Sequence, residues 1–185
     1  MSRWVIFALV LLAPGFVRAA GLRDAIGSDG RLRPGSHRAS FGEIQRVLGT
    51  TPARRGFMRP VRLALLGMQR AGIPRAYLAG SLAGVRKDTP GDADLLFEVD
   101  GDEEFDAPGL IRVARHVMPA GVTIYSSRAR AADASQLPHI TAAQRAAWSA
   151  SPPTFRELFQ QDPLGPVGII EIDLRAPIQP LEHRP

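Results

Sequence analysis

Two short apolar runs near the middle of the chain constrain the fold most strongly. Residues Arg75 to Ala79 and Ala93 to Val99 are apolar and compatible with β-structure, and the loop Leu82 to Gly91 separates them. Stretches with helical periodicity lie on both sides of this pair. A chain with this order of elements is expected to pack amphipathic helices against a sheet.

Two helices are predicted before the first run. Ser40 to Glu43 has capping-box spacing, which predicts the start of a short helix. Between Arg55 and Gln69, apolar residues recur at steps of three and four, and residues 72–74 (Gly-Ile-Pro) predict the end of this second helix.

The C-terminal half continues the same alternation. Leu110 to Val117 predicts an amphipathic helix, Gly121 to Tyr125 a strand, Phe155 to Gln161 a helix and Val167 to Leu174 a final strand. Residues 126–153 are polar and Ala-rich, and we expect them to be irregular. The whole order predicts an α/β (α+β) fold, a small mixed sheet flanked by helices.

Length and composition fit one domain. The chain has 185 residues, 45% of them hydrophobic, and its 18 glycines and 16 prolines follow no period, which excludes collagen and solenoid folds. The absence of cysteine excludes disulfides, thiolate zinc sites and cysteine nucleophiles. We expect a domain over residues 22–175 and a loose tail over 176–185. Its small core leaves room for an oligomer or a partner protein.

Residues 1–21 resemble a secretory signal peptide. Arg3 precedes the apolar run Trp4 to Ala13, and Val17-Arg18-Ala19 fits a small-residue cleavage site. Ten apolar residues are too few to cross roughly 30 Å of hydrocarbon, so we expect no membrane span in the mature domain. The alternative is a mis-assigned start with translation beginning near Leu22. The protein is cytoplasmic in that case, and secreted or periplasmic if the signal peptide is real.

Positive charge in this chain comes almost entirely from arginine. The formal net charge is +5, and Lys87 is the single lysine. This charge permits phosphate binding without demonstrating it. Arg54 and Arg55 have two interpretations of similar weight, contact with a nucleotide or nucleic acid and a basic helix start with no binding role.

The strongest chemical signal is Gly80-Ser81, followed after ten residues by Asp92-Ala93-Asp94. Side chains alternate along a strand, so Asp92 and Asp94 are expected to share one face and to hold hard cations. The backbone N–H groups and hydroxyl of the Gly80-Ser81 turn can hold phosphate oxygens. Arg86 and Lys87, in the loop between these motifs, either steer a triphosphate or face water.

These motifs resemble a known signature. Leu78-Ala79-Gly80-Ser81 followed by Asp92-Ala93-Asp94-Leu95 is similar to that of the DNA polymerase β-like nucleotidyltransferase superfamily. Over roughly residues 27 to 174, the chain also resembles a family of short, uncharacterised prokaryotic nucleotidyltransferase-like proteins. The segments that carry this wider resemblance are residues 30–38, 54–55, 79–81, 90–94 and 168–170.

The resemblance implies an enzyme that moves a nucleoside monophosphate from an NTP to a hydroxyl and releases pyrophosphate. Ser81 would contact the triphosphate, together with Gly80, Arg86 and Lys87 as nucleotide-binding residues. Asp92 and Asp94 would bind Mg²⁺ in a two-metal site, and the metals would supply most of the catalysis. The acceptor is open between RNA, protein and a small molecule, and the superfamily brings toxin–antitoxin members into consideration.

One departure from the superfamily bears on activity. A third carboxylate usually comes from a later strand, and Gly121 to Tyr125 contains none. Glu171 and Asp173 share one face of the final strand, and we predict Asp173 as the third catalytic carboxylate. The alternative is a catalytically degenerate member that acts as a nucleotide-binding or protein-interaction module. A secreted domain of unknown role is the third interpretation, since an exported protein meets little ATP.

Overall fold

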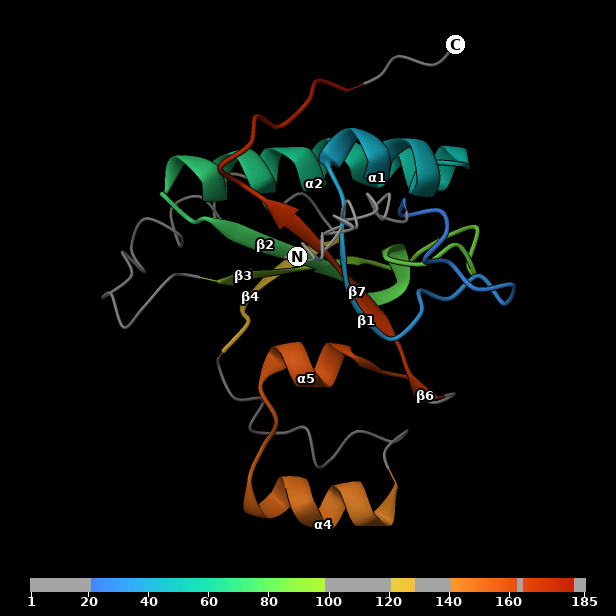
Figure 1. Cartoon of the computed structure of the whole chain (residues 1–185), viewed down its shortest axis with the longest axis vertical. Coiled ribbons are helices and arrows are strands. Elements are labelled where there is room, and N and C mark those ends of the chain that lie inside the picture. Colours follow the sequence, from blue (N-terminus) through green and yellow to red (C-terminus); the bar gives the residue numbers. More distant parts are fainter. Residues whose placement is uncertain (1–20, 99–120, 129–140, 163–164, 182–185) are drawn as a thin grey trace, which may run out of the picture.

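The computed structural model describes residues 21–98, 121–128, 141–162 and 165–181 (Figure 1). The elements in chain order are β1 (Gly35–Arg38), α1 (Phe41–Leu48), α2 (Pro52–Arg70), β2 (Arg75–Ala79), the 3-10 helix η1 (Gly80–Leu82), β3 (Ala93–Glu98), β4 (Val122–Ser126), α4 (Ala142–Ala150), α5 (Phe155–Phe159), β5 (Gln161–Asp162), β6 (Gly165–Pro166) and β7 (Gly168–Asp173).

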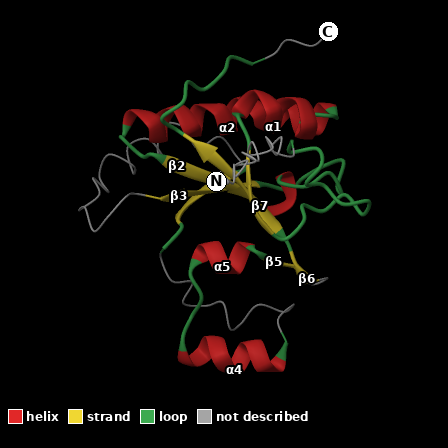
Figure 2. Ribbon diagram, in the orientation of Figure 1, coloured by secondary structure: helices red, strands yellow, loops and turns green. Residues whose placement is uncertain are grey.

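Five strands form one open mixed sheet in the order β1-β7-β2-β3-β4. Strand β2 is antiparallel to both of its neighbours, β3 and β7, whereas β4 runs parallel to β3 and β1 runs parallel to β7. Helices α1 and α2 cover one face of this sheet and α5 lies over the other (Figure 2). The predicted class, a small mixed sheet flanked by helices, is confirmed.

Strand alternation divides the core into two layers. Ala76, Leu78, Leu95, Ile170 and Ile172 point toward α1 and α2, where they join a large buried cluster with residues of both helices. The opposite face carries a smaller buried cluster formed by Tyr77, Ala79, Leu96 and Ile169. This second face also carries Asp94, which makes it the face of chemical interest.

Local signals explain where the first two helices begin. The Ser40 hydroxyl accepts a hydrogen bond from Glu43 N–H at 3.2 Å and caps α1, as the capping-box spacing predicts. Thr51 caps α2 in the same way, with Arg54 N–H as the donor at 3.2 Å, and Pro52 follows at the first helical position. Strands β2, β3, β4 and β7 lie where the apolar runs predict them.

Several described segments differ from the sequence-based expectations. Residues Ala142–Ala150 form α4 inside the segment expected to be irregular, and the cap is a Thr141–Gln144 capping box. The residues of strand β1 are polar and do not predict a strand, because the extended form of this segment comes from pairing with β7. In the tail, which is expected to be loose, Ile178 is buried and Gln179 accepts a hydrogen bond from Gly42 N–H, so these two residues contact the domain.

Some predictions lie outside the described residues: the signal-like segment 1–20, the helix at residues 110–117 and the last residues of the tail, 182–185. Among the helices that the structure describes, none combines the length and the apolar character needed to cross a membrane.

Candidate functional site

The site begins where β2 ends in the Gly80-Ser81 turn. Gly80 has a φ of +70°, a conformation that glycine adopts without strain. A Cβ atom at this position would overlap the Asp94 carboxylate, so the absence of a side chain allows that carboxylate to lie against the backbone of the turn. In the antiparallel register, Asp94 pairs with Ala79, the last residue of β2. The turn and the carboxylate are therefore in direct contact.

Ser81 connects this turn to the second carboxylate. Its hydroxyl donates to Asp92 Oδ1 at 3.1 Å and accepts from Gly91 N–H at 3.2 Å. Asp92 is exposed and lies immediately before β3, whereas Asp94 is the second residue of the strand and is only 6% exposed. The prediction that both lie inside a strand is therefore wrong for Asp92, and the Ser81 hydroxyl holds its side chain at the turn.

Burial gives the Asp94 carboxylate an unusual electrostatic environment. Loss of hydration raises its pKa to about 6, and the negative charge of Asp92 adds to the increase. The pKa of Tyr125 is also raised, first by burial and then by the charge of Asp94. The charge of Asp92 thus disfavours ionisation of Asp94, and a cation bound at the two carboxylates would stabilise the ionised form of Asp94.

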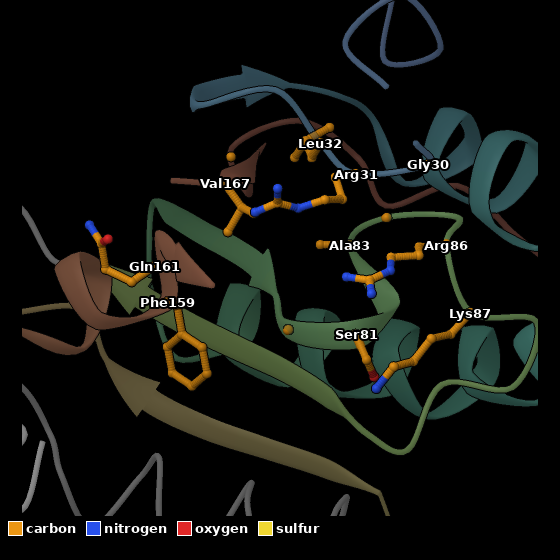
Figure 3. A pocket seen from close by; sticks show the side chains of 13 residues that line it. Gly30, Arg31, Leu32, Ser81, Ala83, Arg86, Lys87, Phe159, Gln161 and Val167 are labelled. Atoms are coloured by element: carbon orange, nitrogen blue, oxygen red, sulfur yellow. The ribbon is translucent and has the colours of Figure 1, made fainter. Parts of the chain in front are cut away.

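A pocket of about 250 Å³ opens beside the turn. All four predicted nucleotide-binding residues, Gly80, Ser81, Arg86 and Lys87, line it. Ser81, Arg86 and Lys87 lie on one side of the pocket, whereas Phe159 lies on the other (Figure 3). The pocket thus has a polar, cationic end and an aromatic end.

Several pocket residues had no predicted role. Arg31, Leu32, Phe159, Gln161 and Val167 also line the cavity. The segment that contains Arg31 and Leu32 belongs to the wider motif pattern, which could have identified it. Nothing local distinguishes the other three residues, because they reach the pocket through the packing of α5 and the β5–β6 hairpin.

The loop that carries Arg86 and Lys87 is held by a buried arginine. Arg54 is 1% exposed, and its guanidinium donates to Leu48 O at 2.6 Å, Lys87 O at 2.6 Å and Leu82 O at 2.7 Å, as well as to Gly84 O. Burial lowers its pKa. Arg54 therefore shapes the loop from inside, whereas Arg55 is exposed.

The comparison with known families covers this whole arrangement. Residues 25–173 match a family model described as a family of unknown function, DUF6932. The chain belongs to the DUF6932 family. The match extends from before β1 to the last residue of β7, so it includes the complete five-stranded sheet and both carboxylates of the site. No curated protein and no solved structure matches the chain.

The DUF6932 fold separates Asp173 from the other predicted catalytic residues. Asp173 pairs with Arg75 at the start of β2, whereas Asp94 pairs with Ala79 at its end. These two positions of β2 are four residue steps apart, which corresponds to about 13 Å along the strand. Asp173 instead accepts a hydrogen bond from Arg175 N–H at 3.0 Å. Because β7 runs antiparallel to β2, its last residues lie far from the turn, and the structure does not bring Asp173 to the site.

Nor does Glu171 complete a carboxylate triad in this DUF6932 protein. Its carboxylate accepts from Ser36 Oγ at 3.2 Å and pairs with Arg38 at 2.9 Å, on the β1 side of the sheet. Thr123 of β4 stands next to Asp94 in the parallel register. Within the described part of the chain, no group of three or more acidic or histidine side chains is placed to hold a metal ion. The described site therefore has two carboxylates, Asp92 and Asp94.

Helix α5 brings aromatic rings to the same face of the sheet. The Tyr125 ring lies 4.5 Å from Phe155 and 5.2 Å from Phe159, measured between centroids. Arg156 fixes the helix by stacking 4.6 Å over the Tyr77 ring and pairing with Glu98 at 3.2 Å. These contacts position Phe159 at the edge of the pocket.

Proposed function

We propose that this DUF6932 protein is a minimal Mg²⁺-dependent nucleotidyltransferase that transfers a nucleoside monophosphate from an NTP to an acceptor hydroxyl. The observation that carries the proposal is the double role of the Gly80-Ser81 turn. The turn lines the pocket and, through its other contacts, holds both carboxylates, Asp92 and Asp94. Phosphate groups and metal ligands would thus meet at one point of the chain.

The polar end of the pocket suits a triphosphate. Arg86 and Lys87 supply positive charge there, on the side of the pocket that carries the Ser81 hydroxyl (Figure 3). Glycines at positions 30, 80, 84 and 168 leave parts of the wall without side chains, so the backbone can approach phosphate oxygens closely. Gly30 O accepts from Val85 N–H at 2.7 Å, which joins the two walls that carry the cations.

The carboxylate pair fits a magnesium ion. Mg²⁺ is commonly held by one or two carboxylates together with substrate phosphates. Asp92 and Asp94 would supply the carboxylates, and the bound NTP would supply the phosphates. Burial raises the pKa of Asp94 to about 6 and the charge of Asp92 adds to the increase, so a bound cation would stabilise the ionised carboxylate. The metal would lower the pKa of the attacking hydroxyl and neutralise the leaving pyrophosphate.

The proposed reaction balances with these groups. The acceptor oxygen bonds to the α-phosphorus, the bond from that phosphorus to pyrophosphate breaks, and the hydroxyl proton passes to water. This chain would bind the triphosphate through Ser81, Arg86 and Lys87 and would orient it toward the carboxylates. Because the donor is an NTP, the proposal requires the protein to work in the cytoplasm.

The aromatic end of the pocket suits a nucleobase. Phe159 lies there, on the side of the pocket that carries Val167 and Gln161 (Figure 3), and an aromatic ring offers a stacking surface that accepts any base. We therefore expect a preference for nucleoside triphosphates over inorganic tripolyphosphate.

A second candidate function is a nucleotide-binding module without transfer activity. It is favoured by the observation that Thr123, and not a carboxylate, stands beside Asp94. This module would bind an NTP in the same pocket and would act through a partner protein.

Label transfer distinguishes the two candidates. The full chain is incubated with Mg²⁺, each α-labelled NTP in turn and a cell extract as the source of acceptors. We expect transfer by the wild type and by Asp173→Asn, and none by Asp92→Asn or Asp94→Asn. NTP binding without transfer would favour the second candidate, and a folded protein that binds no NTP would contradict both.

A further inference from the structure

Helix α2 carries an unusual concentration of positive charge. Its 19 residues include five arginines and no acidic residue. Arg54 points inward, whereas Arg55, Arg59, Arg62 and Arg70 lie on the side away from the buried residues of the helix. At 100° per residue these four positions fall within roughly 80° of the helix circumference, and they extend along about 22 Å of its length.

Within the described part of the chain, none of these four arginines forms an ion pair with a carboxylate. Two of them donate hydrogen bonds to neutral carbonyls, Arg55 to Thr50 O and Arg62 to Gln179 O. Like charges at a spacing of four, as at Arg55 and Arg59, destabilise a helix, and cations in a first turn oppose the helix dipole. The charge pattern therefore works against the stability of α2, as expected at a functional site.

The positive surface continues beyond the helix. A hollow of about 660 Å³ is lined by Arg23, Arg46 and Thr50, with apolar walls that include Val85. Arg55 borders the same hollow, because its guanidinium donates a hydrogen bond to the carbonyl of Thr50 at 3.4 Å. The arginine surface is defined here as Arg23, Arg46, Arg55, Arg59, Arg62 and Arg70.

The loop 82–91 separates this surface from the nucleotide pocket. Val85 lines the hollow, whereas the next two residues, Arg86 and Lys87, line the pocket beside Ser81. The start of α2 contacts the same loop, since the Thr51 hydroxyl donates to Asp88 O at 2.8 Å. A ligand on the arginine surface would thus lie one loop away from the carboxylate pair.

We propose that the arginine surface binds the phosphate backbone of a polynucleotide strand. A row of guanidinium groups along about 22 Å matches a linear series of phosphates better than it matches a single anion. A membrane surface is a poorer partner, because the apolar side of α2 is buried in the core and Leu63 is the exposed large hydrophobic residue on its outer side.

This inference goes beyond the proposed enzyme activity and does not depend on it. If both hold, the acceptor is a nucleic acid, and its free hydroxyl is delivered across the loop 82–91. If the protein transfers no nucleotide, the arginine surface still predicts a nucleic-acid-binding protein.

The test is fluorescence anisotropy with labelled 20-nucleotide RNA and DNA strands, the full chain and a series of KCl concentrations, without NTP. The Arg55→Ala/Arg59→Ala variant is compared with Arg33→Ala/Arg145→Ala, which removes the same charge from exposed positions outside the arginine surface. We expect at least tenfold weaker binding by the first variant and less than about twofold by the control. The slope of log K against log salt should become shallower by about 1.4, since each phosphate contact to a single strand contributes about 0.7.

Three results would overturn the proposal. The first is no binding of either strand, and the second is equal weakening of strand binding in the two double variants. The third is binding to anionic vesicles or polyglutamate that is as tight as strand binding and is weakened as much by Arg55→Ala/Arg59→Ala. Arg55→Lys/Arg59→Lys keeps the charge and should retain the salt slope, so it serves if the alanine variant does not fold. Retained label transfer without strand binding would refute this inference and leave the proposed nucleotidyltransferase activity standing.

Discussion

Replacing Asp94 by asparagine should stabilise the protein above neutral pH. Asp94 is 6% exposed, and burial, aided by the charge of Asp92, raises its pKa to about 6. A carboxyl in an unfolded chain has a pKa of about 3.9, so the folded state binds this proton more tightly than the unfolded state. The ionised carboxylate therefore destabilises the native state. That cost is small below pH 4, grows between pH 4 and 6, and is complete above pH 7.

The size of the effect follows from the two pKa values. A difference of one unit corresponds to about 1.36 kcal/mol, so the full cost at pH 8 is about 3 kcal/mol. At pH 4.5, where Asp94 is ionised in most unfolded molecules but in few folded ones, the same two pKa values give a cost of about 1 kcal/mol. Asparagine has the shape of aspartate and carries no charge, so Asp94→Asn should increase the free energy of unfolding by these amounts. For a domain of this size, about 3 kcal/mol corresponds to a rise in Tm of about 6 to 12 °C.

Urea denaturation and thermal melting at pH 8.0 and pH 4.5, in the presence of EDTA, measure this difference. Asp173→Asn is the matched control, because it makes the same substitution at an exposed aspartate of the same sheet. Added Mg²⁺ should stabilise the wild type at pH 8.0 and leave Asp94→Asn unchanged. A less stable Asp94→Asn at pH 8.0, or a gain of equal size at both pH values, would refute the reasoning.

Three further substitutions test the site. Gly80→Ala should abolish NTP binding and destabilise the fold by about 2 kcal/mol, because Gly80 has a positive φ and an added Cβ atom would overlap the Asp94 carboxylate. The control Gly56→Ala, at a position on α2 with open space around it, should stabilise the fold by about 0.5 to 1 kcal/mol, as measured in urea titrations. Arg54→Ala should lower the free energy of unfolding by at least about 3 kcal/mol, since it removes a buried guanidinium that bonds several carbonyls. Arg55→Ala, at an exposed position, should lower it by less than about 0.5 kcal/mol. Phe159→Ala should weaken NTP binding about tenfold in calorimetry and leave tripolyphosphate binding unchanged; equal losses for both ligands would contradict base stacking.

The sequence by itself determined the elements that depend on neighbouring residues. Capping at Ser40 predicts where α1 starts, and the apolar runs predict β2 and β3. The grouping of the Gly80-Ser81 turn with Asp92 and Asp94 is also close to local, since β2 and β3 are consecutive in the chain and pair directly. For α4 a local signal was present in the Thr141–Gln144 capping box, and the polar composition concealed it.

Only the tertiary structure decided which distant residues join the site. The direction of β7 in the sheet separates Asp173 from Asp94, and the packing of α5 brings Phe159 to the pocket. Burial decided that Arg54 holds a loop while Arg55 faces outward. Strand direction, pairing partners and burial arise from contacts between segments far apart in the chain. A local pattern of residue types carries no information about those contacts, because the same strand can pair in either direction with equally favourable propensity.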